Sequence, residues 1–382
     1  MRMLVLGAGL QGSACAYDLL QNPEVTQVRL ADLHFDHLPA FLAPYSGPRL
    51  IPTPLDVRDR DAVLALMRES DAAMSAIPYY FNLQLAECAV EAGVHFCDLG
   101  GNTEIVFQQK ALAAGAVARG VTVVPDCGVA PGMVNILAEY GIRQLDTVES
   151  VRIYVGGLPQ HPEPPLNYHI VYSLEGVLDY YTTLSSVLRE GKREEVVALS
   201  ERETVTFPAP VGALEAFHTA GGLSTMAWRY EGKIPTMEYK TLRYPGHAEI
   251  METIRGLGLL DLEPVDVKGQ KVVPRDLFVS LVGPKLTKPA ERDLLALRVT
   301  VAGTKGGKPA TRQFDLVDRY DEVHGISAMM RTTGYSLSVT GLMQVRGAVK
   351  PAGVHTPDEC IPPREYIDAL GARGVVINEL SS

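Results

Sequence analysis

The sequence predicts an α/β protein: a doubly wound parallel Rossmann sheet with a second α+β domain that contains a largely antiparallel sheet. Two observations predict the first part. Short apolar runs alternate with helical patterns up to about residue 130, and a Gly-x-Gly-x-x-Gly motif joins the first run to the first helix. After Pro131 strand patterns dominate and only a few helical segments interrupt them, which predicts the second part.

Six strands and four helices are expected in the first part of the chain. The strands are expected over residues 3–9, 28–32, 50–56, 72–78, 95–99 and 121–126, and the helices over 10–20, 61–70, 82–93 and 104–120. Short links between strands and helices predict a parallel sheet that is covered on both faces.

The second part is expected to contain long strands and a helical tail. Strands are expected over 148–158, 203–208, 237–244, 294–305 and 311–320, and helices over 174–191, 247–260, 334–347 and 362–374. A Pro-rich loop, "PQHPEPP", follows the first of these strands.

Composition narrows the class of protein. The 382 residues carry a formal net charge of −10, which disfavours nonspecific binding to nucleic acid or to anionic membranes. The five cysteines are scattered, and no Cys or His spacing is typical of a metal site, so we expect reduced thiols and no metal. With no apolar run long enough for a membrane span and no signal peptide, a cytoplasmic protein is expected.

The stretch "GAGLQG" is expected to bind the pyrophosphate of a dinucleotide. Gly7 allows a tight turn, Gly9 lets the backbone approach the phosphates, and Gly12 lets the helix pack against the strand. Backbone N–H groups at the helix start would hold the anion. The expected contacts are therefore Gly7, Ala8, Gly9, Leu10, Gln11 and Gly12, and the alternative is a purely structural turn.

Acidic residues at two strand ends bear on the choice of cofactor. Asp32 ends the second strand, 20 residues after Gly12, where it could accept hydrogen bonds from both ribose hydroxyls and would repel a 2′-phosphate. No Arg follows it closely, so NAD is favoured over NADP. Asp56 is expected either beside the adenine or as the N-cap of the next helix.

The end of the fourth strand should pass the nicotinamide half of the cofactor. The residues expected to pack there are Ala76, Ile77 and Pro78, and Tyr79 could face the substrate. The alternative is a simple strand-to-helix turn. Val129 and Pro131 are expected to cross between the domains beside the nicotinamide.

Motifs across nearly the whole chain carry a family resemblance. They are "VLGAGLQG" (5–12), "DLGG" (98–101), "PDCGVAPGMVNILAEYG" (125–141), "YVGGLPQHPEPPLNY" (154–168), "SLEGVLDYYT" (173–182), "LEAFHTAGGLST" (214–225), "EYKTLRYPGHAE" (238–249) and "MMRTTGYS" (329–336). With these motifs the chain resembles the saccharopine dehydrogenase-like family and is most similar to the lysine 6-dehydrogenases.

The resemblance implies a domain arrangement and an activity. Residues 1–130 and 331–382 would form the NAD-binding domain, with the C-terminal helices returning to it, and 131–330 would bind substrate and mediate a homodimer. The implied reaction is NAD-dependent oxidative deamination of the ε-amine of L-lysine. Its product, allysine, would cyclise to 1-piperideine 6-carboxylate.

Such a reaction needs an anion site for the α-carboxylate. Arg243 is the favoured residue because a guanidinium binds a carboxylate in a bidentate manner. Alternation along "EYKTLRY" places Tyr239 on the same face as Arg243, with Lys240 opposite. The alternative is an ion pair between Arg243 and a neighbouring acid. Arg331 is expected either at a second carboxylate site or in a domain linker.

The reaction also needs a group that accepts a proton from the amine. His218 is the favoured base because imidazole titrates near neutral pH, and Glu215 could orient it or contact the ammonium itself. Asp98 and Asp126 end strands at the carboxyl edge of the sheet, where ligands bind. Either could contact the amine, or could bond loop N–H groups.

Two other functions remain open from the sequence. One is reductive condensation, as in relatives of saccharopine reductase or carboxynorspermidine synthase, which should need at least two separate basic clamps. The other is a non-catalytic NAD-binding regulator.

Overall fold

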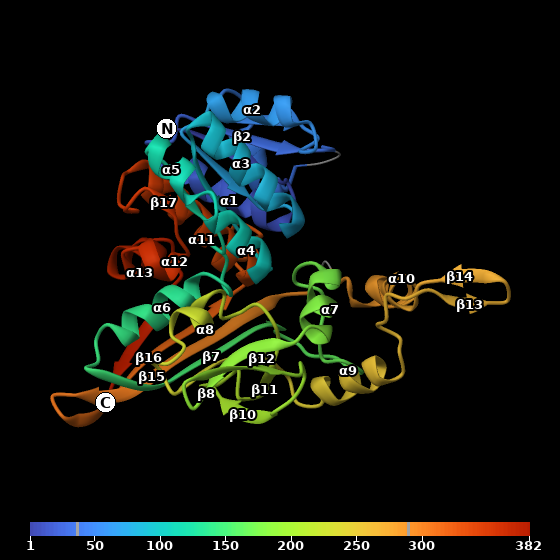
Figure 1. The fold of residues 1–382 in the computed structure, drawn as a ribbon. Helices are drawn as coiled ribbons and strands as arrows, with labels where there is room; N and C mark the ends of the chain where they lie inside the picture. The colour runs from blue at the N-terminus through green and yellow to red at the C-terminus, as the bar shows by residue number, and fades with distance from the viewer. Residues whose placement is uncertain (36–37, 289–290) are drawn as a thin grey trace.

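The computed structural model describes residues 1–35, 38–288 and 291–382. It contains two main sheets, one in each half of the molecule, and a smaller two-stranded sheet (Figure 1). The first sheet lies in the blue half of the ribbon with red C-terminal helices beside it, and the second lies in the green and orange half.

The first sheet has seven parallel strands in the order β17-β6-β5-β4-β1-β2-β3. The strands are β1 (Arg2–Leu6), β2 (Gln27–Asp32), β3 (Leu50–Pro54), β4 (Ala72–Ser75), β5 (His95–Asp98), β6 (Thr122–Val124) and β17 (Gly353–Val354). The central strands are buried on both faces, as their continuous apolar runs require. The prediction of a doubly wound parallel sheet is confirmed.

Helices cover both faces of this sheet. They are α1 (Leu10–Gln21), α2 (Arg60–Arg68), α3 (Asn82–Ala92), α4 (Thr103–Lys110), α5 (Ala113–Arg119) and α11 (Ala328–Val345). Helices α1 and α11 pack into the apolar core on one face, while α2, α3 and α5 pack on the other. The single helix expected over 104–120 is instead two helices, α4 and α5. Asn102 caps the start of α4 by accepting hydrogen bonds from two of its N–H groups.

The second sheet has nine strands and is mainly antiparallel. Its strands are β7 (Thr147–Pro159), β8 (Ser185–Arg189), β9 (Lys192–Val196), β10 (Glu203–Thr206), β11 (Ala213–His218), β12 (Thr236–Arg243), β15 (Asp293–Lys305), β16 (Lys308–Arg319) and β18 (Asn378–Ser381). Only β12 and β7 pair in parallel within the described sheet. Helices α6 (Met133–Ile142) and α8 (Met226–Arg229) lie between this sheet and the first domain (Figure 1).

One expected helix of the second domain is shorter than predicted. Helix α7 (Leu174–Thr182) begins after its N-cap Ser173 but ends at Thr182, and strand β8 follows within the segment expected as a helix over 174–191. The residues after Thr183 include two serines and Val187, which favour extended backbone over helix. Helix α9 (His247–Gly256) starts as expected and ends four residues early.

The C-terminal segment returns to the first sheet. A Cβ on Gly334 of α11 would lie 2.7 Å from the Ala14 Cβ of α1, so the two helices touch through their backbones. Strand β17 then extends the sheet beside β6, followed by α12 (Pro357–Cys360) and α13 (Pro363–Gly371). On these contacts we propose that the cofactor domain comprises 1–130 and 331–382, although β18 pairs with β16 of the second sheet.

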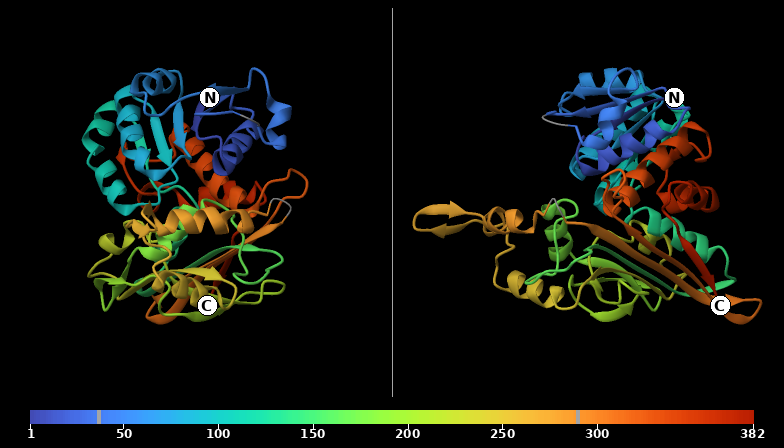
Figure 2. Two further views of the ribbon diagram at one scale, coloured as in Figure 1. Left: turned by 90° about the vertical axis from the view of Figure 1, so that its right-hand side faces the viewer. Right: turned by 180° about the vertical axis from the view of Figure 1, so that it is seen from behind.

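A narrow arm projects from the second domain. It consists of residues 257–288, with the hairpin strands β13 (Val265–Val267) and β14 (Gln270–Val272) and the helix α10 (Pro274–Leu286). Figure 2 shows the hairpin standing clear of the rest of the molecule. Among the helices of the described ranges, none has both the length and the apolar character needed to cross a bilayer.

Candidate functional site

In the glycine loop, Gly7 and Gly12 have no room for a side chain, whereas Gly9 has open space beside it. A Cβ on Gly12 would lie 1.8 Å from the Gly7 carbonyl oxygen. Gly7 has φ +101°, and a Cβ on it would lie 2.8 Å from the Ala76 carbonyl oxygen. A Cβ on Gly9 would meet nothing within 4 Å. The loop is therefore packed against the sheet at Gly7 and Gly12 and open at Gly9, where a pyrophosphate would approach.

The residues around the loop fit a dinucleotide. Both amide atoms of the Gln11 side chain are buried without a hydrogen-bond partner in the described chain, at the start of α1. Buried polar atoms are rarely left unpaired, so this amide is suited to a ligand. Asp32 ends β2 and accepts a 2.6 Å hydrogen bond from the N–H of Ala8, which fixes its carboxylate beside the loop.

The other expected cofactor residues lie along the same sheet edge. Ile77, with Ala76 before it, packs on Gly7, and the exposed side chain of Leu10 starts α1. Asp56 follows β3 but binds Arg58 in a bidentate pair, which lowers the pKa of the carboxyl to about 2. The N-cap of α2 is Asp59 and not Asp56, so the capping alternative for Asp56 is wrong.

Substitutions in this loop should separate folding from binding. We expect Gly9→Ala to keep the thermal unfolding temperature of the wild type, because its Cβ meets no protein atom, but to weaken NAD binding. Gly12→Ala should lower the unfolding temperature as well, because its Cβ overlaps a carbonyl oxygen. Calorimetric titration with NAD and thermal melts check both. Equal melting losses in the two variants would contradict this account.

Two buried carboxyl groups meet where β5 and β6 end. Asp98 accepts hydrogen bonds from the Gly100 N–H (2.8 Å) and the Gln109 amide (2.7 Å). Asp126, with φ +63°, accepts a 2.5 Å bond from the Ser224 hydroxyl and a 3.2 Å bond from the Gly101 N–H. Asp126 thus joins the first domain to the loop after β11.

Burial gives both acids unusual protonation behaviour. Burial raises the pKa of Asp126 to about 7, an effect that the nearby Asp98 charge increases and the Ser224 hydrogen bond opposes. Burial likewise raises the pKa of Asp98 to about 6, against its hydrogen bonds. A carboxyl with a pKa near neutrality can accept and release protons under physiological conditions, which suits a general base.

Two tyrosines, Tyr79 of the first domain and Tyr180 of the second, lie close to Gly101, whose N–H donates to Asp126. The Tyr180 hydroxyl of α7 lies 3.1 Å from where a Cβ on Gly101 would be, and the Tyr79 ring lies 4.0 Å from the same point. On β12 the ring of Tyr239 packs directly against Gly222, whose carbonyl accepts a hydrogen bond from Asn135 of α6. The loop carrying Ser224 is therefore held between Tyr239 and the start of α6.

The guanidinium of Arg243 is held by neutral groups. Its Nε donates to the Tyr181 hydroxyl (3.1 Å) and its Nη1 to the Leu242 carbonyl (2.8 Å), and it lies 4.8 Å from the Tyr168 ring centroid. Tyr181 in turn contacts His247 Nε2 (3.0 Å), whose Nδ1 contacts the Leu166 carbonyl (2.9 Å).

The direction of these hydrogen bonds follows from charge. Burial lowers the pKa of His247 to about 3, so its ring is neutral. Because the Leu166 carbonyl can only accept, Nδ1 carries the proton and Nε2 accepts from Tyr181. The Tyr181 oxygen is then free to accept from Arg243, which leaves Nη2 as a donor without a hydrogen bond in the described chain.

Arg243 is unusual among the buried cations. In the described ranges three Lys or Arg residues are buried: Lys240, Arg243 and Arg275. Lys240 pairs with Glu203 at 2.7 Å and Arg275 with Asp179 at 2.5 Å, whereas Arg243 has no carboxylate within ion-pair distance among the residues that the structure describes. A buried charge is stable only with a counter-charge or strong hydrogen bonds, so Arg243 is suited to an anionic ligand.

Family models cover both halves of the chain. Residues 3–124 match the model described as Saccharopine dehydrogenase NADP binding domain, and residues 128–375 match the Saccharopine dehydrogenase C-terminal domain. The chain belongs to the saccharopine dehydrogenase family. The family resemblance seen in the sequence is thereby confirmed, and membership places this chain among nucleotide-dependent oxidoreductases of amino acid amines.

Relatives of this saccharopine dehydrogenase family member differ in the activity they are named for. Carboxyaminopropylagmatine dehydrogenase of Synechocystis is 23% identical over 99% of the chain and 97% of its own length. The NADP(+), L-glutamate-forming saccharopine dehydrogenase of Saccharomyces cerevisiae is 24% identical over 77% of the chain and 66% of its own length. The solved apo structure of the yeast enzyme covers 100% of the chain with a TM-score of 0.81 and 22% identity, which shows the shared fold.

Two expected site residues have structural partners in this family member. Both carboxylate oxygens of Glu215 accept hydrogen bonds at the start of α9, from the N–H groups of Gly246 (3.1 Å) and Ala248 (2.6 Å). Arg331 pairs with Asp318 (2.9 Å) and Asp321 (3.3 Å). Glu215 therefore caps a helix instead of orienting His218 or contacting the amine, as predicted, and Arg331 holds a salt-bridge network instead of a second carboxylate.

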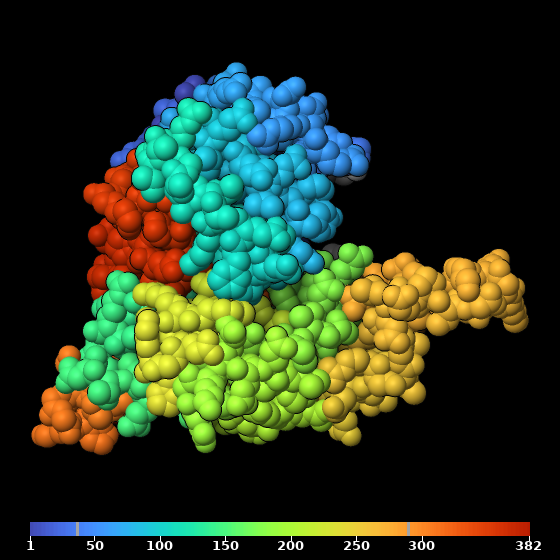
Figure 3. All heavy atoms as spheres, viewed as in Figure 1, coloured from blue at the N-terminus to red at the C-terminus, as the bar shows by residue number. Residues whose placement is uncertain are grey.

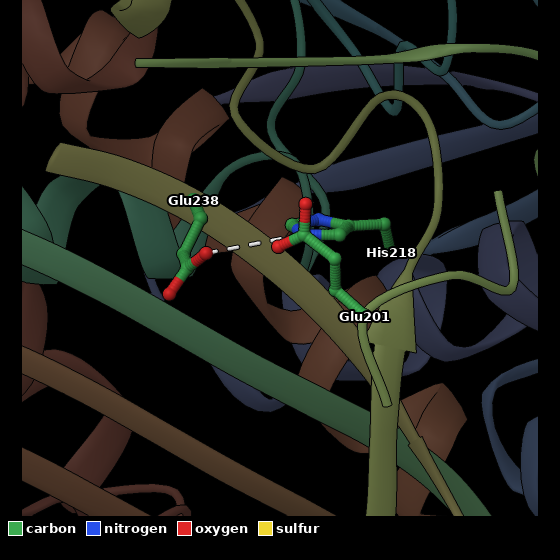
Figure 4. A group of neighbouring side chains, drawn as sticks. All are labelled: Glu201, His218 and Glu238. Carbon is green, nitrogen blue, oxygen red and sulfur yellow. Dashed lines mark hydrogen bonds and ion pairs between the residues drawn. The ribbon is translucent and has the colours of Figure 1, made fainter. Parts of the chain in front are cut away.

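The structure places His218 on the wrong face of the sheet for a general base. His218 pairs with Lys240 in the β11–β12 register and so shares the face of Lys240 and Glu238, opposite to Tyr239 and Arg243. Its Nε2 lies 3.1 Å from Glu201 (Figure 4). The prediction that His218 is the base is corrected on this ground.

The two glutamates beside His218 could offer metal ligands, but a cation already neutralises them. The Arg189 Nη2 lies 2.8 Å from both Glu201 and Glu238. His218, Glu201, Glu238 and Arg189 thus form a closed polar network behind the sheet.

Replacing His218 should affect stability and not turnover. We expect His218→Asn to cost about 1–3 kcal/mol of unfolding free energy, because it leaves buried groups of the network unpaired. Chemical denaturation and steady-state kinetics check this. A large fall in kcat with an unchanged unfolding free energy would return His218 to the active site.

Some functional candidates were missed in the sequence. Tyr181 meets Arg243 across 62 residues of the chain, and Ser224 reaches Asp126 across 98 residues. The motif "SLEGVLDYYT" did contain Tyr180 and Tyr181, and a tyrosine pair on a short helix of the second domain was the available signal.

Proposed function

We propose that this chain is an NAD-dependent dehydrogenase that oxidatively deaminates the ε-amine of L-lysine. The observation that carries the proposal is Arg243, a buried guanidinium with a free donor and no carboxylate partner in the described chain. A single cation of this kind matches a substrate with a single carboxylate. Saccharopine-type substrates carry more carboxylates and should need further clamps, but Arg331 is already paired with two aspartates.

The spacing of the site supports a substrate of several carbons. Tyr239 lies beside the loop that bonds Asp126, and Arg243 lies four residues along the same strand and face. Four strand residues span on the order of 13 Å between Cα atoms, and the side chains shorten that gap. An anion at Arg243 and an amine near Asp126 would then be separated by an extended chain such as that of lysine.

Asp126 is the proposed proton acceptor. Its carboxylate would take a proton from the ε-ammonium, so that the neutral amine can release hydride from the adjoining carbon. Bound NAD would accept that hydride, and water would then hydrolyse the resulting imine to the aldehyde and ammonia. Asp98 and the Ser224 hydroxyl would keep Asp126 in place and influence its pKa.

Asp32 supports NAD over NADP as the cofactor, although the yeast relative is named for NADP(+). We expect Asp32→Ser to raise the NADP over NAD ratio of kcat/KM by roughly 100-fold, because it removes the repulsion of a 2′-phosphate and the ribose hydrogen bonds. Parallel kinetics with both cofactors check this. Asp56→Ser, the neighbouring acid that pairs with Arg58, is the matched control and should leave the ratio unchanged.

A second candidate function is reductive condensation. The Synechocystis relative, which the chain matches over 97% of the relative's length, is named carboxyaminopropylagmatine dehydrogenase. That name favours a substrate with a secondary amine. The single unpaired guanidinium is compatible with a substrate of that kind as well, so the two candidates differ mainly in the group beyond the reacting carbon.

One assay separates the candidates. Purified protein is given NAD or NADP with L-lysine, ornithine, saccharopine or carboxyaminopropylagmatine, and formation of reduced cofactor is followed at 340 nm. Turnover with lysine and NAD supports the proposal. Turnover with a secondary amine alone supports the second candidate, and cofactor binding without turnover of any amine supports a regulator.

A further inference from the structure

A cavity lies between α1 and α11, at the end of α1 that points away from the glycine loop. Its volume is about 500 Å³, within the range of small-molecule sites. Four segments line it: the C-terminal half of α1, helix α11, residues 321–324 and residues 372–373. We call it the α1–α11 cavity. Asn22, one of its lining residues, is the C-cap of α1 and lies on the order of 18 Å along the helix from Gly9 at the other end.

The return of the C-terminal segment builds the walls of this cavity. The space-filling view shows the C-terminal residues, in red, packed against the side of the first domain (Figure 3). Arg373 of this segment donates through Nε to Asp18 of α1 at 2.7 Å, and the Asp18 side chain is only 4% exposed. Arg331 of α11 pairs with Asp321 at 3.3 Å. Because these ion pairs hold the walls together, the cavity needs little rearrangement to accept a ligand.

The two carboxylates of the cavity are already used within the protein. One Asp18 oxygen accepts from Arg373, and the other accepts from the Ser338 hydroxyl. One Asp321 oxygen accepts from two backbone N–H groups of the loop that follows it, and the other accepts from Arg331. A cationic ligand would have to compete with these donors, so the cavity is poorly suited to one.

Four donors at the cavity, in contrast, have no acceptor among the residues that the structure describes. Arg373 uses Nε and Nη1, which leaves Nη2, and Arg346 uses Nε and Nη2 on Glu24, which leaves Nη1. The hydroxyls of Tyr17 and Tyr335 also lack a partner there, although only 7% and 4% of these residues are exposed. Buried polar groups normally have partners, so these donors are suited to a ligand rich in acceptors.

We propose that the α1–α11 cavity binds a small molecule through an oxyanion, either a carboxylate or a phosphate. An ionised oxyanion presents only acceptors and so matches the four donors. Its hydrogen bonds to the two guanidinium groups would be charge-assisted, which makes them stronger than bonds between neutral groups. The site uses neither Arg243 nor Asp126, so the proposal does not depend on which amine the enzyme oxidises.

Titration with two simple oxyanions tests the site. The full-length protein is titrated in a calorimeter with inorganic phosphate and, separately, with citrate, and chloride at equal ionic strength is the blank. We expect saturable binding of at least one of the two probes. Binding of phosphate alone would identify a phosphate-bearing ligand, and binding of citrate alone would identify a carboxylate.

Two hydroxyl deletions test where the probe binds. Tyr17→Phe with Tyr335→Phe removes two groups that have no partner in the described chain, so this double variant should melt at the wild-type temperature. Its dissociation constant for the probe should rise by about 5- to 150-fold, the effect of losing two hydrogen bonds. Arg346→Gln should weaken binding too, whereas Arg68→Gln is the matched control. Both arginines are exposed and pair with a glutamate, but Arg68 belongs to α2, on the other face of the sheet.

Three results would overturn the proposal. The first is that neither probe binds in a saturable way, and the second is that the tyrosine double variant binds as tightly as the wild type. The third is binding that Gly9→Ala or Arg243→Leu abolishes and the tyrosine double variant does not, which would assign the probe to the cofactor or the substrate site.

Discussion

Replacing Arg243 by Leu should lower kcat/KM for L-lysine by roughly 100-fold, while turnover of cadaverine, which is lysine without its carboxylate, should hardly change. Charge-assisted hydrogen bonds to a buried guanidinium contribute about 1.5–3 kcal/mol each, which corresponds to about 10- to 150-fold. Arg243 makes its bonds to Tyr181 and Leu242 and keeps a donor for the ligand. Steady-state kinetics with both amines measure the difference.

The controls for this experiment lie on the same strand. Arg243→Lys keeps the charge but loses the planar fork, so it should recover only part of the activity. Lys240→Met removes the cation on the opposite face of β12 and should leave discrimination between lysine and cadaverine intact. If Arg243→Leu reduced the rates for both amines equally, the guanidinium would hold the fold and not the carboxylate.

Replacing Asp126 by Asn should lower kcat by a factor of about 10² to 10⁴, the usual contribution of a general base. The wild type should also lose kcat/KM as the pH falls below about 7, because the pKa of Asp126 is raised to about 7 and the acid form cannot accept a proton. The variant should lack this limb of the profile. A profile from pH 5 to 9 with lysine in excess measures both effects.

A neighbouring substitution tests the cause of that pKa. Asp98→Asn removes the negative charge next to Asp126, so the acidic limb should move to lower pH. A limb that stayed in place would mean that another group titrates there.

The same two acids should make stability depend on pH. Because the folded pKa values of both acids lie above their unfolded values, the pair lowers the unfolding free energy progressively as the pH rises through about 6 and 7. Asp126→Asn should therefore unfold at a higher temperature than the wild type at pH 8.

The first domain could be predicted from the sequence because its signals are local. The glycine motif, the apolar runs and the strand-end acids each depend on neighbours within about 25 residues, and the observed elements follow them. The face of β12 that carries Arg243 was also predictable, since alternation along one strand requires no knowledge of its partners.

The position of His218 could not be predicted in this way. Its face depends on pairing with Lys240, which lies 22 residues later in the chain, and only that register shows that it points away from Arg243. Glu215 is the helix cap for the same reason: Gly246 lies 31 residues later and meets it only through the fold. A sequence shows which side chains have suitable chemistry. The face of the sheet on which each side chain lies is set by strand pairing with distant residues, which the sequence does not show.

The return of α11 to the first sheet has a consequence for how this protein is made. Roughly 200 residues separate β6 from α11 along the chain. Most side chains of α11 are buried, and the helix packs on the first domain. At the usual rate of translation, a ribosome needs roughly 10–40 s to make that interval. During this time the nascent first domain has an uncovered apolar face, which chaperones would have to shield. A stop codon in this interval would therefore leave an unfolded cofactor domain, and not an otherwise intact one without its tail.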